Sequence, residues 1–456
     1  MTSAGSPADT GASRLWLLVA VEAAALWGMA WGGSGTPWPA IPLWVVAFAA
    51  YLGAAGYAAA PHPASAPPHE RRAPPLARRH VWTAGIALRV GVLPSVPALS
   101  EDIYRYIWDG WVQSNGVNPY AHPPSASALE ELRTAWWPLI NHADVSTIYP
   151  PGAQIVFALL ASAGTGWWIF KLAWLAADLL VARLIDRLSP GRSVLPLLLY
   201  LWSPLVVVEV AWSGHLDPLG VAPMLGGVAL AGTAAVPAWR SGALLGLGGA
   251  VKFAPLAALP ALFRLRGPGA LAAAVLVPLL LYVPYVGAGP ALFDGLRTYG
   301  DLWEFNSGTY RILERLPGHP DVAKWIGASI VGVIAWWAAL RRWPLERALL
   351  WTIGSALLLS PTLHPWYLLW VLPFACLSAN RGWLLFSGTV FLAYAGRGAY
   401  LATGAWPEPA WLASLIHAPP LALLAWDGWR GRRSQRLVRR ERVARGEEGR
   451  EGQDGG

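Results

Sequence analysis

The chain has 456 residues, of which 55% are hydrophobic and only 13% are charged, and its net charge is +8. Soluble domains carry about 25% charged residues, so this composition excludes an ordinary soluble protein. It predicts an all-α polytopic membrane protein with spans of about 20 apolar residues each. The positive charge comes from arginines at the ends of apolar runs, which indicates membrane topology rather than nucleic-acid binding. A single cysteine, Cys376, excludes an intramolecular disulfide.

The N-terminal third sets the predicted topology. Residues 1–13 are small and polar, and we expect a disordered cytoplasmic segment there. Spans are predicted at 15–31 and 38–60. The proline-rich loop 61–80 that follows carries four arginines and one acid, so the positive-inside rule places it in the cytoplasm. A third span at 81–99 therefore leads outward.

A long outer loop, residues 100–151, is predicted next and is the expected catalytic loop, because plain connections are much shorter. Within it, Ser125–Trp137 is expected to form a short amphipathic helix on the membrane surface. The apolar piece 152–163 is too short to span and is predicted to be re-entrant or interfacial. The run 167–188 is a full-length span whose terminal arginines place its end inside.

The rest of the chain is predicted to alternate between spans and short polar turns. A broken hairpin is expected near 252–255, where glycines and a proline interrupt the apolar run 241–263. A second outer loop is expected at 289–322. The other predicted spans are 194–212, 218–236, 270–286, 323–340, 348–359, 366–379, 383–400 and 411–426.

These runs give twelve spans plus the hairpin, or fourteen spans if the hairpin arms cross the membrane. The prediction is one membrane domain over residues 14–426 and a basic cytoplasmic tail over 427–456, with both termini inside. Every arginine cluster then falls on one side and every unusual polar motif on the other.

The segment Ser100–Tyr120, SEDIYRYIWDGWVQSNGVNPY, carries four charged residues between two apolar blocks. Asp102 is interpreted either as an acid that caps a helix or as a general base that accepts a proton from a sugar hydroxyl. Glu101 beside it would raise the pKa of one carboxylate by repulsion, whereas Arg105 would lower it. Asp109 lies on the same helical face, where it orients either Arg105 or the substrate.

Two cations are expected deeper in the membrane, where ionisable groups are functional candidates. Arg89 lies about three helical turns below Asp102 if the third span continues. It either snorkels, pairs with an acid such as Glu22 or Glu209, or holds a phosphate. Lys252 lies at the predicted helix break and either binds a lipid-linked phosphate or snorkels.

Further polar groups are predicted on the outer face in His215, Asp217, Arg311 and His364. His364 precedes Pro365 at the end of a span, and it is either an ordinary interfacial histidine or a donor to a leaving phosphate. The sequence has no zinc-ligand spacing, no glycine-rich phosphate loop after a strand and no Ser-His-Asp order.

Several of these segments resemble one known superfamily. SEDIYRYIWDG, followed by NPY and YPP, resembles the first outer loop of bacterial GT-C glycosyltransferases. The nearest groups are the GT87/DUF2029-like polyprenyl-phosphate-mannose mannosyltransferases and the mycobacterial-type alpha-1,6-mannosyltransferases. The turn Gly214–Asp217 and the segments Gly248–Pro260 and Ser360–Pro373 are also similar to recurring pieces of that superfamily.

The resemblance implies a GT-C-type bundle that transfers a sugar with inversion from a polyprenyl-phosphate donor to an acceptor on the outer face. It assigns Asp102 as the catalytic base and His364 as the histidine of the late outer motif. No cofactor and no tightly held metal are expected, because cationic side chains can neutralise a monophosphate leaving group. The predicted substrate-binding residues are Glu101, Arg105, Asp109, Tyr149, His215, Asp217, Lys252, Arg311, Tyr367 and Arg89.

The predicted partners are thus a polyprenyl-phosphate-sugar donor, a glycolipid or glycan acceptor and membrane lipids. The predicted location is the inner (cytoplasmic) membrane, with an extracytoplasmic active site. Three alternatives stay open: a lipid flippase or transporter, a related enzyme that moves another sugar unit, and a structural subunit of an envelope complex. A transporter would need paired charges in two repeats, and the sequence has no internal repeat.

Overall fold

The computed structural model describes residues 7–32, 40–60, 76–315 and 320–444, and these residues form helices and connecting turns. In these ranges the only β-type pairing is an isolated bridge between Phe305 and Thr362. The predicted all-α class is therefore confirmed. The expectations for residues 1–6, for 61–75 of the cytoplasmic loop and for the last twelve residues of the tail lie outside the described ranges.

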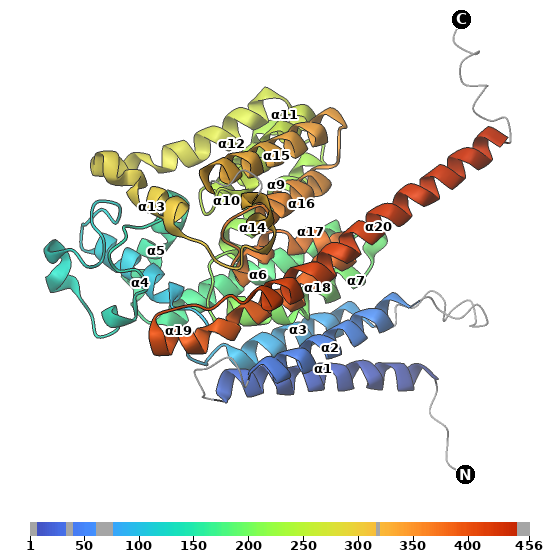
Figure 1. Ribbon diagram of the computed structural model, residues 1–456, viewed down its shortest axis with the longest axis horizontal. Helices are drawn as coiled ribbons and strands as arrows, with labels where there is room; N and C mark the ends of the chain where they lie inside the picture. The colour runs from blue at the N-terminus through green and yellow to red at the C-terminus, as the bar shows by residue number, and fades with distance from the viewer. Residues whose placement is uncertain (1–6, 33–39, 61–75, 316–319, 445–456) are drawn as a thin grey trace, which may run out of the picture.

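Three helices form a layer along one side of the molecule (Figure 1). They are α1 (Pro7–Trp31), α2 (Ala40–Ala59) and α3 (Arg78–Val92). Helix α1 begins at Pro7, so the disorder expected up to residue 13 does not extend over residues 7–13. The other face of α3 packs against α7 (Leu195–Leu201) and the π-helix η4 (Val207–Trp212).

The remaining helices build the body of the bundle, in which α9, α10 and α12 pack closely and α18 packs on α20. Their bounds are α5 (Pro151–Ala163), α6 (Trp167–Leu188), α8 (Pro204–Val206), α9 (Pro218–Ala231), α10 (Ala238–Gly249), α11 (Leu259–Arg266), α12 (Pro268–Leu281), α15 (Pro320–Leu340), α16 (Leu345–Leu358), α17 (Leu372–Leu377), α18 (Arg381–Thr389) and α20 (Ala410–Ala444).

In the described part of the chain, four helices are individually long and apolar enough to cross a membrane. They are Ser13–Trp31, Ala40–Ala59, Leu195–Trp212 and Asp321–Leu340, and the bent pair Pro268–Leu281 with Val283–Leu302 is a fifth candidate. Most of the other predicted spans coincide with shorter or divided helices. Prolines such as Pro365 and Pro373 divide these runs, because proline cannot donate a hydrogen bond to the preceding turn.

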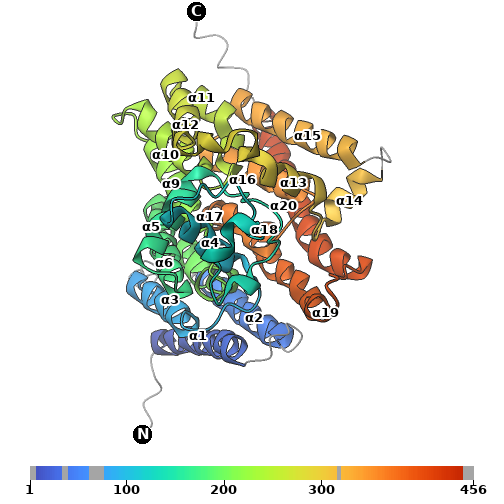
Figure 2. The same cartoon turned by 90° about the vertical axis from the view of Figure 1, so that its left-hand side faces the viewer.

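One end of the molecule carries α4 (Asp102–Ser114), α13 (Asp294–Leu302), α14 (Gly308–Glu314) and α19 (Arg397–Thr403). Figure 2 looks at this end and shows α4 near its centre, with α13 on one side and α18 and α19 on another. Helix α1 begins and α20 ends at the opposite end (Figure 1). The polar loops therefore lie at one end of the bundle, and the start of α1 and the end of α20 lie at the other end.

Two sequence-based expectations for the outer loop are wrong. The predicted amphipathic helix Ser125–Trp137 is replaced by two short 3-10 turns, Ser127–Leu132 and Trp137–Leu139. Helix α3 ends at Val92 and does not continue toward Asp102. The predicted break near Lys252 is confirmed, because α10 ends at Gly249 and a 3-10 turn, Ala254–Ala258, leads into α11.

Two glycines allow α5 to approach both α4 and the segment that precedes this break. A Cβ on Gly110 of α4 would lie 2.2 Å from the carbonyl oxygen of Phe157 in α5. At the start of α5, the backbone N–H of Gly152 donates to the carbonyl of Ala250 at 2.9 Å, and a Cβ there would lie 2.8 Å from the same oxygen. Helix α5 is therefore held against both α4 and the segment that carries Lys252.

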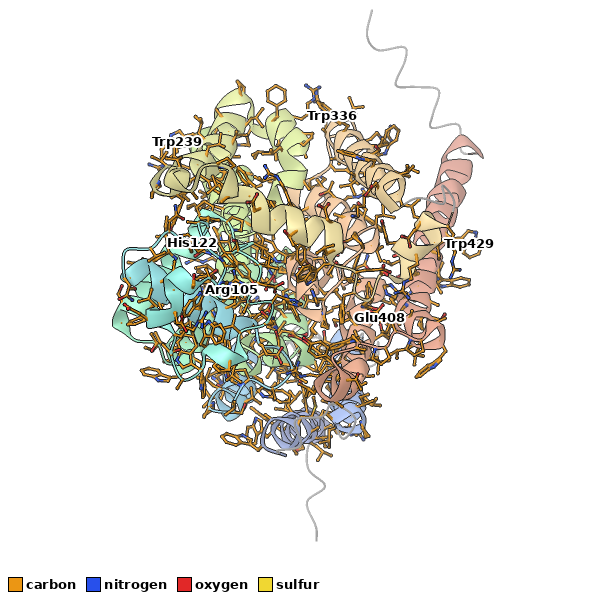
Figure 3. The ribbon with its side chains drawn as sticks, turned by 60° about the vertical axis from the view of Figure 1, so that its left-hand side comes forward. Arg105, His122, Trp239, Trp336, Glu408 and Trp429 are labelled. Atoms are coloured by element: carbon orange, nitrogen blue, oxygen red, sulfur yellow. The ribbon has the colours of Figure 1, made fainter. Side chains whose placement is uncertain are left out.

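The large number of tryptophans has two explanations. Trp44, Trp108, Trp174, Trp202 and others are fully buried and fill the core. Trp239, Trp336 and Trp429 lie on the periphery and project outward, whereas Arg105 lies inside the bundle (Figure 3). Exposed aromatic rings of this kind suit a membrane environment, in which indole sits at the lipid interface.

Candidate active site

A pocket opens at the end of the bundle that carries α4, and residues from distant parts of the sequence line it. Its cavity volume is about 90 Å³. The lining comes from α4 and the loop after it, from the Lys252 break, from α13 and from the segment after α16. The lining residues are Asp102, Arg105, Asn141, His142, Val145, Ile148, Tyr149, Lys252, Tyr299, Trp303, His364, Trp366 and Tyr367.

Asp102 is the first residue of α4, where the helix dipole favours a carboxylate. Its Oδ1 accepts a hydrogen bond from the side-chain amide of Asn141 at 2.9 Å. Burial raises the pKa of Asp102, while the Asn141 bond and the charge of Lys252 oppose that rise. Glu101 adds to the rise, as predicted from the sequence, but Lys252 and not Arg105 supplies the opposing positive charge.

His215 lies behind Asp102 and is fully buried. Its Nδ1 is 3.8 Å from Oδ2 of Asp102, and its Nε2 is 3.3 Å from Oε2 of Glu209 in the π-helix η4. Glu209 in turn accepts from the hydroxyl of Tyr394 at 3.1 Å. Burial and the nearby Lys252 lower the pKa of His215 well below its usual value, so this imidazole is neutral at pH 7.

Lys252 supplies a positive charge to the same pocket. Its Nζ lies 2.6 Å from Oδ1 of Asp217 and 4.9 Å from the centre of the Tyr367 ring. The same Asp217 oxygen accepts from the indole of Trp370 at 2.5 Å. One fifth of the lysine side chain remains exposed while Asp217 is completely buried. Asp217 therefore fixes the lysine from behind and leaves its ammonium group accessible from the pocket.

Arg105 is a second cation in the pocket wall. Its Nε donates to Oδ1 of Asp109 at 2.9 Å, so Asp109 orients Arg105, which is one of the two roles that the sequence left open. Asp109 also accepts from Thr147 and Gln154, and these bonds hold the end of the outer loop. The buried Nη2 of Arg105 has no hydrogen-bond partner among the described residues, which leaves a donor available to an anion or a hydroxyl.

Four rings form a continuous stack along one side of the pocket. Phe305 lies over His364, with centroids 4.5 Å apart, and His364 lies over Trp366 at 4.3 Å. Trp366 then stacks on His215 at 3.8 Å, behind Asp102. Burial, with the charge of Lys252, lowers the pKa of His364 to about 3. His364 is therefore neutral at pH 7, and it can donate one N–H but cannot act as an imidazolium acid.

Three predicted substrate-binding residues, Glu101, Arg311 and Arg89, neither line the pocket nor lie directly behind it. Glu101 accepts from Arg397 of α19 at 2.5 Å and ties the outer loop to that helix. Arg311 pairs with Glu304 at 2.7 Å and with Glu408 at 3.2 Å. Both pairs stabilise the surroundings of the pocket.

Arg89 lies elsewhere in the bundle and is fully buried. Its Nε lies 2.5 Å from Oδ2 of Asp178 in α6, which was not among the predicted partners. Its Nη1 donates to the carbonyls of Gly85 and Leu201, and Tyr200 donates to the other oxygen of Asp178. Arg89 therefore connects α3, α6 and α7.

Of the twelve predicted site residues, the structure brings Asp102, Arg105, Tyr149, Lys252, His364 and Tyr367 to one pocket. His215, Asp217 and Asp109 lie directly behind it. Asn141, His142, Tyr299 and Trp303 also line the pocket and were not predicted from the sequence. The only signal in the sequence that could have indicated them is the group of aromatic residues in the segment LWEFNSGTYR (302–311), which contains Trp303.

In the described ranges, no group of three or more His, Cys, Asp or Glu side chains is arranged to hold a metal ion. The positively charged side chains that line the pocket are Lys252 and Arg105.

The fold and the pocket together define a polytopic helical membrane protein with an acid and two cations at one mouth of its bundle. The model of a known family, described as "Alpha-(1->6)-mannopyranosyltransferase, N-terminal domain", matches residues 19–266. This match covers more than half of the sequence, and the chain belongs to this family of GT-C-type mannosyltransferases. No curated protein and no solved structure matches the chain.

Proposed function

We propose that this mannosyltransferase uses polyprenyl-phosphate-linked mannose as its donor and transfers the sugar, with inversion, to a glycolipid or glycan acceptor. The single observation that carries the proposal is that Asp102 and Lys252 line the same pocket. Inverting transfer needs a base on the acceptor side and positive charge at the departing phosphate. Residues 100–151 act as the catalytic outer loop of a membrane domain over residues 14–426.

Asp102 serves as the base. The acceptor hydroxyl oxygen forms a bond to the anomeric carbon while the bond from that carbon to the phosphate oxygen breaks. The hydroxyl proton passes to Asp102, whose raised pKa makes it a better proton acceptor than an ordinary carboxylate. Asn141 holds the carboxylate in place through its bond to Oδ1.

The cations serve the leaving group. Lys252 and the free Nη2 of Arg105 offer donors to the phosphate oxygens, and neutral His364 offers one N–H. A polyprenyl phosphate leaves as a stable anion, so no strong acid has to protonate it. This division agrees with a donor that carries one phosphate and with chemistry that uses no metal. An α-linked product formed with inversion requires a β-linked donor.

The proposed location is the inner membrane, with the pocket on its extracytoplasmic side. Arginines concentrate at the bundle end opposite to the pocket; Arg264 and Arg266 end α11 and Arg341 follows α15. The positive-inside rule assigns that end to the cytoplasm. A lipid-linked donor reaches an outer pocket from the bilayer, whereas a nucleotide sugar is confined to the cytoplasm.

The test is a donor panel on purified protein in liposomes. Polyprenyl-phosphate-mannose, other polyprenyl-phosphate sugars and GDP-mannose are each supplied with membrane-extract acceptors, and the products are identified by mass spectrometry. We expect mannosylated product from the lipid-linked mannose alone, with activity that persists after chelation of divalent metals. Transfer from GDP-mannose would overturn the donor assignment. Movement of the lipid between leaflets without any transfer would instead identify a transporter.

A further inference from the structure

A second cavity, which we call the outer groove, lies beside the candidate active site. Its cavity volume is about 560 Å³. Its lining residues are His142, Asp144, Val145, Ser146, Asp294, Gly295, Thr298, Leu302, Trp303 and Glu304. Three of these, His142, Val145 and Trp303, also line the pocket that contains Asp102. The groove and the pocket are therefore neighbouring compartments that share one wall.

The shared wall contains two aromatic rings, and one of its residues has an unusual backbone conformation. The rings of His142 and Trp303 meet edge to face, with centroids 4.4 Å apart. His142 has a φ of +47°, a left-handed conformation that residues other than glycine rarely adopt. Such strained positions concentrate at functional sites, where surrounding structure fixes a side chain at a defined place. Here the strain directs an imidazole toward the boundary between the two cavities.

The outer groove has a fixed floor. Helix α13 approaches the outer loop so closely that a Cβ on Gly295 would lie 2.3 Å from the carbonyl oxygen of Ser146. Asp294 precedes this glycine and Thr298 follows it by one turn, so both groove residues come from the same anchored helix. The cavity therefore has defined walls and is not only a set of acids on a mobile surface.

The groove and the pocket differ in charge. The groove contains the carboxylates of Asp144, Asp294 and Glu304, whereas the pocket contains Lys252 and Arg105 beside a single carboxylate, that of Asp102. Asp294 accepts from Arg297, and Glu304 accepts from Arg311, yet each carboxylate can accept several more hydrogen bonds. Carboxylates repel phosphate and accept hydrogen bonds from neutral sugar hydroxyls, so the groove suits uncharged sugar and the pocket suits the phosphate.

We propose that the outer groove binds the acceptor glycan, holding the sugar residues that lie behind the one that reacts. Trp303 provides an apolar face for a pyranose ring, and Asp144 and Asp294 accept bonds from its hydroxyls. The terminal sugar then lies beside His142 and Trp303, which line both cavities, and its hydroxyl points to Asp102. This inference rests on the proposed transfer to a glycan acceptor. It adds that the enzyme prefers an acceptor of two or more sugars over a single one.

The test compares a long and a short acceptor with the same donor. In the double variant Asp144→Asn, Asp294→Asn, the ratio of kcat/KM for a manno-trisaccharide to that for a mannose monosaccharide glycoside should fall about tenfold. The matched control is Asp301→Asn, which removes an exposed acid from the same helix outside the groove. The control should keep the wild-type ratio. An unchanged ratio in the double variant would overturn the proposal.

A binding measurement separates this proposal from the donor assignment. Saturation-transfer NMR with the manno-trisaccharide and the full-length protein in detergent requires no donor and no turnover. Wild type and Asp301→Asn should bind the trisaccharide, and the double variant should bind it about tenfold more weakly. That result supports the groove even if polyprenyl-phosphate-mannose is not the donor. Equal binding by all three proteins, or binding by none, would refute it.

Discussion

Two buried arginine–carboxylate pairs in this bundle have different surroundings. Arg89 and Asp178 are completely buried between α3, α6 and α7, and neither lines the pocket that contains Asp102. Arg105 and Asp109 are also nearly buried, but the guanidinium faces the cavity that holds Asp102 and Lys252. Both arginines have a nitrogen without a partner among the described residues. The difference lies in access, since only Arg105 meets space that a substrate can occupy.

The two pairs show that a charged residue within an apolar run does not by itself identify a functional site. An ionisable residue in a membrane bundle is a functional candidate by default, and on that ground Arg89 and Lys252 are both candidates. The structure separates them: Arg89 joins helices, and Lys252 faces the pocket. Variants of the two regions should therefore fail in different ways, one in stability and the other in turnover.

The largest effect is expected from Asp102→Asn. The amide cannot accept the acceptor proton, so kcat should fall by about 10³-fold or more. The folded structure should persist, because the carboxylate makes one side-chain bond, to Asn141. Turnover of labelled donor and the melting temperature in detergent measure the two properties. Glu130→Gln, an exposed acid in the outer loop, is the control. Full activity in Asp102→Asn would exclude this residue as the base.

The opposite pattern is expected from Asp178→Ala. This change leaves the buried guanidinium of Arg89 without its counter-ion, which costs about 3–5 kcal/mol of folding free energy. Denaturant unfolding in detergent measures the loss, and activity per folded molecule at low temperature should stay near that of wild type. Adding Arg89→Met should recover part of the stability, because the unpaired charge is removed. A normal melting temperature combined with lost turnover would instead place Arg89 in the site.

Lys252→Gln should reduce kcat by about 10²-fold, since the leaving phosphate loses its main positive contact. Lys252→Arg should recover part of that loss, because the charge remains but the geometry differs. Arg264→Gln, an exposed cation at the end of the same hairpin, is the matched control. An effect confined to stability would show that Lys252 only neutralises Asp217.

The smallest effect is expected from Asn141→Ala, and it concerns pH. The base works only when deprotonated, so activity falls as the pH drops through the pKa of Asp102. The Asn141 bond lowers that pKa against the effect of burial. Its removal raises the pKa further, and the acidic limb of kcat/KM should move to higher pH. A profile that stays in place or moves to lower pH would contradict the role of this bond.

The sequence predicted much of the architecture because apolar runs and helix breakers are local signals. The bounds predicted for α6 agree with the structure, and the break at Lys252 lies where glycines and Pro255 interrupt a run. The outer loop was predicted less well. Its compact 3-10 turns depend on contacts such as Trp111 with the Leu132 carbonyl, which joins residues 21 positions apart.

The candidate site was predicted in part for the same reason. Asp102, Lys252 and His364 stand out because they are polar residues in apolar surroundings. Asn141 and Trp303 have no such local contrast, and only folding brings them to the pocket. The partner of Arg89 was also missed, because Asp178 is one of several acids that composition alone cannot rank.

The two glycines around α5 have a consequence for how precisely the site is built. Gly110 lets α4 touch α5, and Gly152 lets α5 touch the segment before Lys252, so α5 acts as a spacer between the base and the cation. Every residue other than glycine has a Cβ, which would not fit at either position. The absence of a Cβ at these two glycines therefore sets the separation between Asp102 and Lys252. A methyl group at either position would keep every reacting atom and still spoil their alignment, and a misplacement of about 1 Å can cost about 10²-fold in rate.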